Sequence, residues 1–206
     1  MFPLAFDIRY NYQMSYQVYT TEAIVCGSFN SGTADKSYLL FTRSAGMLYA
    51  TARSVREERS RQRYALQDFS HITVSLVQGK SGWRIGSVDT KLNFFVTAES
   101  RELRGSVVRI VKYLRRYVQG EEAHFDLFDD VLTGLQVVSG GNVVNVMLYE
   151  QFFMVRMLHL LGYVAVPTKH LAVFGTPLNQ LTGIEYGPAV LDCEALITTA
   201  QSVSHL

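Results

Sequence analysis

Five arginines fall within eleven residues, in the segment RSVREERSRQR at positions 53–63, which we call the basic segment. Guanidinium groups this close repel one another unless an anion lies among them, and their fixed fork of donors matches phosphate oxygens. A groove that binds nucleic acid without reading its sequence needs such backbone contacts. The alternative is a solvated loop that Glu57 and Glu58 partly neutralise. The candidate DNA ligands in the basic segment are Arg53, Arg56, Arg59, Arg61 and Arg63.

Other cations and aromatic residues lie close to the expected turns of the same half of the chain. Four cations join the candidate DNA-binding set: Lys36, Arg43, Lys80 and Arg84. Four aromatic residues are candidates for stacking on bases: Tyr38, Tyr49, Tyr64 and Trp83. Aromatic residues of a small barrel also fill its core, so packing in the interior is the other interpretation.

Residues that could support catalysis or bind a metal are scattered. The sequence lacks a glycine-rich phosphate loop, a His-Glu-x-x-His motif and a Gly-x-Ser-x-Gly elbow. Its two cysteines, Cys26 and Cys193, exclude a site of four thiolates and are typical of a reducing compartment. The acidic residues at 121–130 match a metal site only in composition, and we interpret them as a solvated helix start. We therefore expect no enzyme, no metal site and no cofactor.

Charge divides the chain into two unlike halves. Residues 1–116 contain 17 Lys and Arg against 9 Asp and Glu, a net charge of +8. Residues 117–206 contain 2 against 9, a net charge of −7. We expect the amino half to meet a polyanion and the carboxyl half to bind protein instead.

The elements that position these residues change type near residue 97. Up to there the chain reads as short, β-rich runs separated by turn residues, with 92–98 as a bridge or last strand. Five strands in about 80 residues predict a small closed barrel, of which the oligonucleotide-binding (OB) barrel is the leading form and the SH3-like barrel the alternative. The expected strands cover residues 16–29, 36–43, 47–55, 69–79 and 83–90.

From residue 99 onward, the apolar residues recur at the spacing of a helix. The first helix carries apolar residues on one face and basic residues on the other, among them Lys112, Arg115 and Arg116. Further helices are expected over 125–138, 143–163 and 189–202. The fold class is therefore α+β, an amino-terminal five-stranded OB barrel followed by a carboxyl-terminal helical domain. The expected divisions are an extra segment at 1–14, the OB domain at 15–97 and the helical domain at 98–206.

Neither a membrane span nor a signal peptide is expected. The longest apolar stretch, residues 143–166, is interrupted by polar and charged side chains. The first 13 residues lack a basic start, and Met14 is a candidate initiator. We expect a cytoplasmic protein.

The order of several motifs resembles the RecO family of recombination mediators. ATARSVREERSRQRYALQDFS at 50–70 is similar to the family's basic loop and the Leu-Gln-x-Phe segment after it. TEAIVCGSF and KSYLLFTRSAGMLYA resemble its opening strands. HFDLFDDVLTGLQ and FFMVRMLHLLGY resemble two of its helices, and the final SHL its terminus. Two departures stand out: Ser54 replaces a glycine common in the family, and residues 166–179 lack the family's cysteine pairs. The resemblance therefore implies a metal-free variant.

The resemblance implies a non-enzymatic DNA repair and recombination mediator. Such a protein binds single-stranded DNA, and in some cases duplex DNA, anneals strands, and helps to load a recombinase onto strands coated by single-strand-binding protein. A RecR-type partner, the tail of single-strand-binding protein and association with the bacterial nucleoid are implied as well. For the tail we expect Arg156, with Arg116 and Lys112 within reach; an internal ion pair of Arg156 with Glu150 or a nearby aspartate is the alternative. A protein-only adaptor and an RNA-binding accessory factor stay open as other functions.

Overall fold

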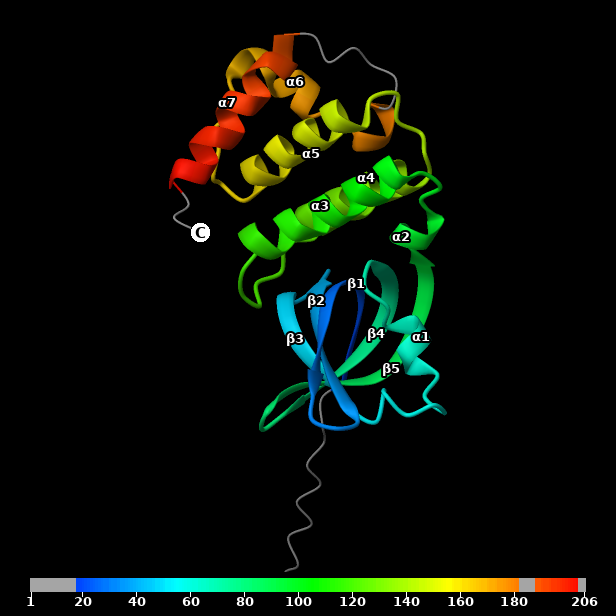
Figure 1. Ribbon diagram of the computed structural model, residues 1–206. Helices are drawn as coiled ribbons and strands as arrows, with labels where there is room; N and C mark the ends of the chain where they lie inside the picture. The colour runs from blue at the N-terminus through cyan, green and yellow to red at the C-terminus, as the bar shows by residue number, and fades with distance from the viewer. Residues whose placement is uncertain (1–17, 182–187, 204–206) are drawn as a thin grey trace, which may run out of the picture.

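Five strands close into a barrel in the computed structural model, which describes residues 18–181 and 188–203 (Figure 1). The strand order is β1-β2-β3-β5-β4, with β3 and β5 parallel and the other neighbours antiparallel. This is the order of an OB barrel, so the predicted fold is confirmed. The strands are β1 (Val18–Ser31), β2 (Asp35–Thr42), β3 (Gly46–Ala52), β4 (Ser70–Gly79) and β5 (Gly82–Asn93).

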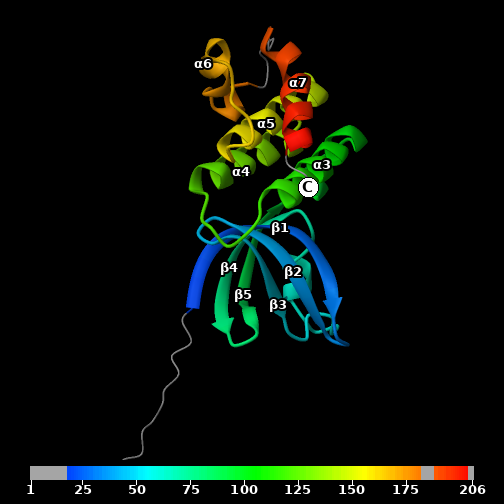
Figure 2. The same cartoon turned by 90° about the vertical axis from the view of Figure 1, so that its left-hand side faces the viewer.

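The helices that follow β5 cover one end of the barrel, and one short helix before β4 lies beside the barrel wall (Figures 1 and 2). Ser100 and Asn145 begin two of them by accepting backbone N–H bonds from Leu103 and Leu148. Among the described residues, no helix is long and apolar enough to cross a membrane. The helices are α1 (Gln62–Ala65), α2 (Phe94–Thr97), α3 (Arg101–Tyr117), α4 (Phe125–Ser139), α5 (Val146–Leu160), α6 (Leu171–Phe174) and α7 (Pro188–Val203), with 3-10 turns at Thr168–His170 and Leu178–Gln180.

The segment at 92–98 differs from the expected bridge or strand. Leu92 and Asn93 end β5, and Phe94–Thr97 forms α2. The Asn93 side chain accepts the Val96 N–H at 3.0 Å, which ends the strand and begins the helix in one residue. Residues 1–17, including the expected extra segment, and the final SHL lie outside the described residues.

Two apolar cores share the wall of the barrel. One fills its interior with residues such as Val25, Leu40 and Ile72. The other combines the outward side chains of β1, β2 and β3 with those of the helices, and in it the Phe41 and Phe128 rings lie 5.4 Å apart. The barrel and the helices are therefore packed through a common core, and we keep the division at residues 97 and 98 as a proposal.

The turn between β2 and β3 lies directly against the loop that follows α3. Gly46 has a left-handed φ of 61°, and a Cβ atom there would overlap the carbonyl oxygens of Gly120 and Glu122. The next residue, Met47, donates its N–H to Gly120 at 2.9 Å. Only glycine satisfies both the backbone conformation and the close approach.

We predict that Gly46→Ala lowers the free energy of unfolding by roughly 3 kcal/mol, because left-handed strain of about 1 kcal/mol adds to overpacking against the loop. Gly32→Ala is the matched control, since Gly32 also has a positive φ, 79°, but has no atom within 4 Å of an added Cβ. Urea denaturation of both variants measures the difference. Equal losses would show that the turn does not pack against the loop.

Candidate nucleic-acid interface

The basic segment is attached to the β1–β2 loop at its start. Ser54 has a left-handed φ of 51° and donates its N–H to Asp35 Oδ1 at 2.8 Å, and the Arg56 N–H donates to the Ala34 carbonyl at 3.1 Å. Glycine adopts a left-handed φ without the steric cost of a Cβ atom, which explains why glycine suits this position. In this chain the Asp35 carboxylate holds Ser54 in that conformation.

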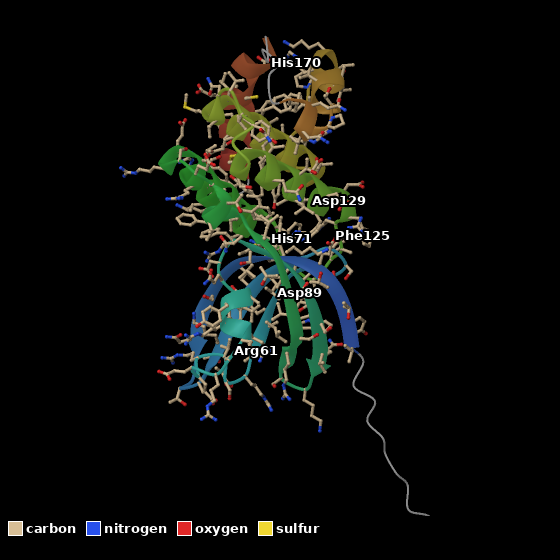
Figure 3. All side chains as sticks on the ribbon, turned by 90° about the vertical axis from the view of Figure 1, so that its right-hand side faces the viewer. Arg61, His71, Asp89, Phe125, Asp129 and His170 are labelled. Carbon is tan, nitrogen blue, oxygen red and sulfur yellow. The ribbon has the colours of Figure 1, made fainter. Side chains whose placement is uncertain are left out.

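All five arginines of the basic segment are exposed. Arg56 donates to the Gly32 carbonyl at 3.2 Å, and Arg63, within α1, donates to the Tyr64 hydroxyl at 2.8 Å. In the part of the chain that the structure describes, none of the five forms an ion pair, so Glu57 and Glu58 do not neutralise them by direct contact. Arg61 directly precedes α1 and lies low on the barrel, at the end away from the helices that follow β5 (Figure 3).

An exposed aromatic pair lies on the outside of β1, β2 and β3, the side that we call the outer face. Phe29 and Tyr49 are 52% and 58% exposed, and their ring centroids lie 5.7 Å apart across β2. The Arg115 guanidinium of α3 lies beside Gly27, within 3.3 Å of where a Cβ atom would stand. Gly27 and Tyr49 both pair with Leu39, so Arg115 and the aromatic pair share one region of the sheet.

Sequence reasoning named Tyr49 but missed Phe29. The pairing of β1 with β2 shifts between Val25 and Gly27, so a bulge reverses the alternation of side chains after Cys26. Uninterrupted alternation from the buried Val25 would direct Phe29 into the barrel. Gly27, within a strand, is the one sequence signal for such a bulge.

The other stacking candidates occupy different surroundings. Tyr38 is 1% exposed in the barrel wall, and burial raises the pKa of its hydroxyl to about 12. Trp83 is half-buried, donates its indole N–H to Glu121 at 2.9 Å and packs edge-on to Tyr19. Tyr64 is exposed beneath the Arg63 guanidinium, 4.8 Å from its ring centroid. Of the two interpretations of Tyr38, packing in the interior is therefore the one that the structure contains, and Tyr38 is no longer a stacking candidate.

Arg43 belongs to the contact between barrel and helices rather than to the cationic surface. It donates to both carboxylate oxygens of Asp129 in α4, at 3.0 and 2.8 Å, and lies over the Phe125 ring. This hydrogen bonding holds the pKa of Asp129 below its ordinary value. We therefore remove Arg43 from the candidate DNA ligands, because its guanidinium is occupied by a carboxylate.

Among the residues that the structure describes, Lys80 and Arg84 do not line a common cavity with the basic segment, although Arg84 pairs with Thr51 of β3, two residues before Arg53; the Arg84 guanidinium lies beside Gly79. Lys80 lies in the turn of the β4–β5 hairpin, whose tip is at the lower left of the barrel in Figure 1, whereas the basic segment lies on the right. By contrast, Lys36, Arg56 and Arg63 line one cavity. The structure thus gathers three of the nine predicted cations, and Arg53, Arg59 and Arg61 are exposed nearby in the chain.

Arg156 is occupied inside the helical half. Its guanidinium pairs with Asp130 in α4 and donates to the carbonyls of Phe174 and Thr176, each at 2.6 Å. The Arg156 and Asp130 side chains are only 16% and 18% exposed. An internal ion pair is therefore what the structure contains, with Asp130 as the partner. We withdraw Arg156 as a contact for a partner tail, because its donors are used within the fold.

The region without the family's cysteines is packed against α5. Phe174 stacks on Phe152 with centroids 4.2 Å apart, and the Arg156 bonds fix the carbonyls beside it. Within residues 18–181 and 188–203, no group of three His, Cys, Asp or Glu side chains could hold a metal ion. The acidic residues at 121–130 include Glu121, Asp129 and Asp130, which bond to Trp83, Arg43 and Arg156, so they are more than a solvated helix start.

Lys112 and Arg116 are exposed on α3, and Arg116 lies over the Tyr117 ring. Arg109, on the same helix, forms a bidentate pair with Glu150 of α5 at 2.7 and 2.8 Å. Cations of the positive half therefore meet acids of the negative half at Arg43–Asp129 and Arg109–Glu150. These two ion pairs join the positive half of the chain to the negative half, so part of the opposite charge stabilises the fold.

A family model and several curated relatives match this chain. The model described as "Recombination protein O N terminal" matches residues 14–92. The DNA repair protein RecO of Heliobacterium modesticaldum is 30% identical over 154 residues, which cover 71% of this chain and 52% of that protein. The DNA repair protein RecO of Thermobifida fusca is 40% identical over 73 residues, or 35% of this chain and 30% of that protein. The chain spans about half the length of the longer-matching relatives.

We predict that Arg156→Met lowers the free energy of unfolding by roughly 3 kcal/mol, because it leaves the half-buried Asp130 and two carbonyls without their donor. Lys169→Met is the control, since Lys169 makes an exposed ion pair with Asp192 and should cost less than about 1 kcal/mol. Chemical denaturation followed by circular dichroism measures both. A loss for Arg156→Met no larger than for the control would contradict a structural role.

Proposed function

This chain belongs to the RecO family by its amino-terminal barrel, and from this premise we propose that it binds single-stranded DNA during repair and recombination. The main observation in support of this proposal is the exposed Phe29–Tyr49 pair on the outer face, which has cations at both of its ends. Each base offers a flat face to an aromatic ring, and each phosphate a pair of oxygens to a guanidinium. Binding of this kind tolerates any sequence.

The path of the strand follows from the positions of these groups. Toward the helices, Arg115 lies beside Gly27, and Lys112 and Arg116 are exposed on the same helix. At the other end, Arg53 follows β3 directly and opens the basic segment. We infer that phosphates contact α3 at one end and the basic segment at the other, while bases stack on Phe29 and Tyr49 between them.

The same surface accounts for annealing without a catalytic group. Two complementary strands repel each other through their phosphates, and cations that screen this repulsion lower the barrier to their encounter. Loading of a recombinase onto strands coated by single-strand-binding protein, and a RecR-type partner, belong to this proposal through the family alone. For the acidic tail of single-strand-binding protein, Lys112 and Arg116 are the cations that we retain. The proposed setting is the bacterial cytoplasm, at the nucleoid.

We predict that replacing Phe29 and Tyr49 together with Ala weakens binding of a fluorescent oligodeoxythymidylate by roughly thirtyfold or more, because two stacked bases at about 1–3 kcal/mol each contribute at least about 2 kcal/mol. The dependence of log Kd on log salt should stay the same, since the cations that bind the phosphates are kept. Phe125→Ala is the control, as Phe125 is equally exposed but lies in α4. Unchanged binding by the double variant would exclude stacking on this pair.

We also predict that Arg53→Glu, Arg59→Glu and Arg61→Glu combined reduce the salt slope by about 0.7 for each phosphate that the protein no longer neutralises. Titrations at four or more salt concentrations measure the slope, and a matched length of RNA tests for selection by the 2′-hydroxyl. An unchanged slope would remove the basic segment from the interface. Absence of binding to either nucleic acid would favour a protein-only adaptor.

A further inference from the structure

A cavity of about 480 Å³ opens between the inner side of the β1–β2 ribbon, the basic segment and α1. Its volume lies within the range of about 300–1,000 Å³ that is typical of sites for small molecules. It is separate from the outer face: Ser28 lines the cavity, whereas the next residue, Phe29, points to the other side of the ribbon.

Three cations line this cavity. Lys36 comes from β2, Arg56 from the middle of the basic segment and Arg63 from its end, within α1. Their hydrogen bonds go to neutral groups: Ser28 Oγ at 3.5 Å, the Gly32 carbonyl at 3.2 Å and the Tyr64 hydroxyl at 2.8 Å, respectively. None of the three pairs with a carboxylate among the described residues. The three cations outnumber the one carboxylate of the lining, that of Asp68, and this excess of positive charge favours a dianionic ligand such as a terminal phosphate.

The rest of the lining contains apolar side chains and hydrogen-bond acceptors, which a site for phosphate alone would not need. Tyr38, Val55 and Leu66 give it buried, largely apolar walls. Gln67 and Asp68 add an amide and a carboxylate, which accept hydrogen bonds from amino and hydroxyl groups. A nucleoside has a flat apolar body and such donors, and the Asp68 charge disfavours a chain of several phosphates.

We propose that this cavity binds one nucleoside monophosphate, with the phosphate among Lys36, Arg56 and Arg63 and the nucleoside against the apolar walls. The nucleotide comes from one of two sources. It is free in solution, or it is the phosphorylated end of a strand that crosses the outer face; only this second source rests on the proposed function.

Calorimetric titration of the full chain with dCMP tests the proposal. We expect saturable one-to-one binding that weakens at least tenfold in Arg63→Gln and in Lys36→Gln, which change a helix and a strand separately. Arg101→Gln is the control, an exposed cation on the first turn of α3, and should bind dCMP like the wild type. Deoxycytidine and inorganic phosphate should each bind at least tenfold more weakly than dCMP.

Oligodeoxycytidylates of one length with a 5′-phosphate, a 3′-phosphate or no phosphate separate the two sources. A preference of threefold or more for a phosphorylated end, abolished in Arg63→Gln, identifies the strand end; dCMP binding without such a preference identifies the free nucleotide. No saturable dCMP binding together with no end preference would overturn the proposal. So would dCMP affinity equal to that of inorganic phosphate. Oligonucleotide binding that still depends on Phe29 and Tyr49 in those cases would leave the proposed function standing.

Discussion

Close packing of the β2–β3 turn against the loop after α3 determines how the rest of the molecule is arranged. Gly46 allows the carbonyls of Gly120 and Glu122 to approach the turn, and Phe41 on the adjoining strand packs on Phe128. An isolated barrel would expose the outward apolar residues of its first three strands to water, which hydrophobic burial disfavours. The helices therefore cover an apolar face of the barrel that would otherwise be exposed to water.

This packing decides which cations are available to a ligand. Arg43, Arg109 and Arg156 are used in ion pairs that connect the barrel, α3, α4 and α5. It also places α3 above β1, so that Arg115 lies beside Gly27 at the edge of the exposed aromatic pair. The basic segment, attached through Asp35 and Ala34, presents its arginines at the opposite end of the barrel. Net charge alone does not separate the structural cations from the exposed ones.

The sequence predicts where helices and strands lie better than it predicts the contacts that a single side chain makes. Strand alternation and helical spacing are local patterns, so the five strands, α3, α4 and α5 follow from them, whereas α2 does not, because Asn93 caps a helix of only four residues. Phe29 is hidden by a bulge that reverses the alternation in β1. Arg43 and Arg156 are bound by residues 86 and 26 positions away, and no local pattern reveals such partners. The arginines of the basic segment are predictable because their density is itself a local signal.

We propose that single-stranded DNA lies over the outer face of the barrel, with bases against Phe29 and Tyr49. Ultraviolet crosslinking of an oligonucleotide that contains 5-iododeoxyuridine tests it most directly, because this base reacts efficiently with an aromatic ring on which it stacks. Mass spectrometry of the digested complex should locate crosslinks in peptides from β1 and β3, at Phe29 and Tyr49. Crosslinks confined to peptides of α4 and α5, with none in β1 or β3, would show that the strand does not lie over the outer face.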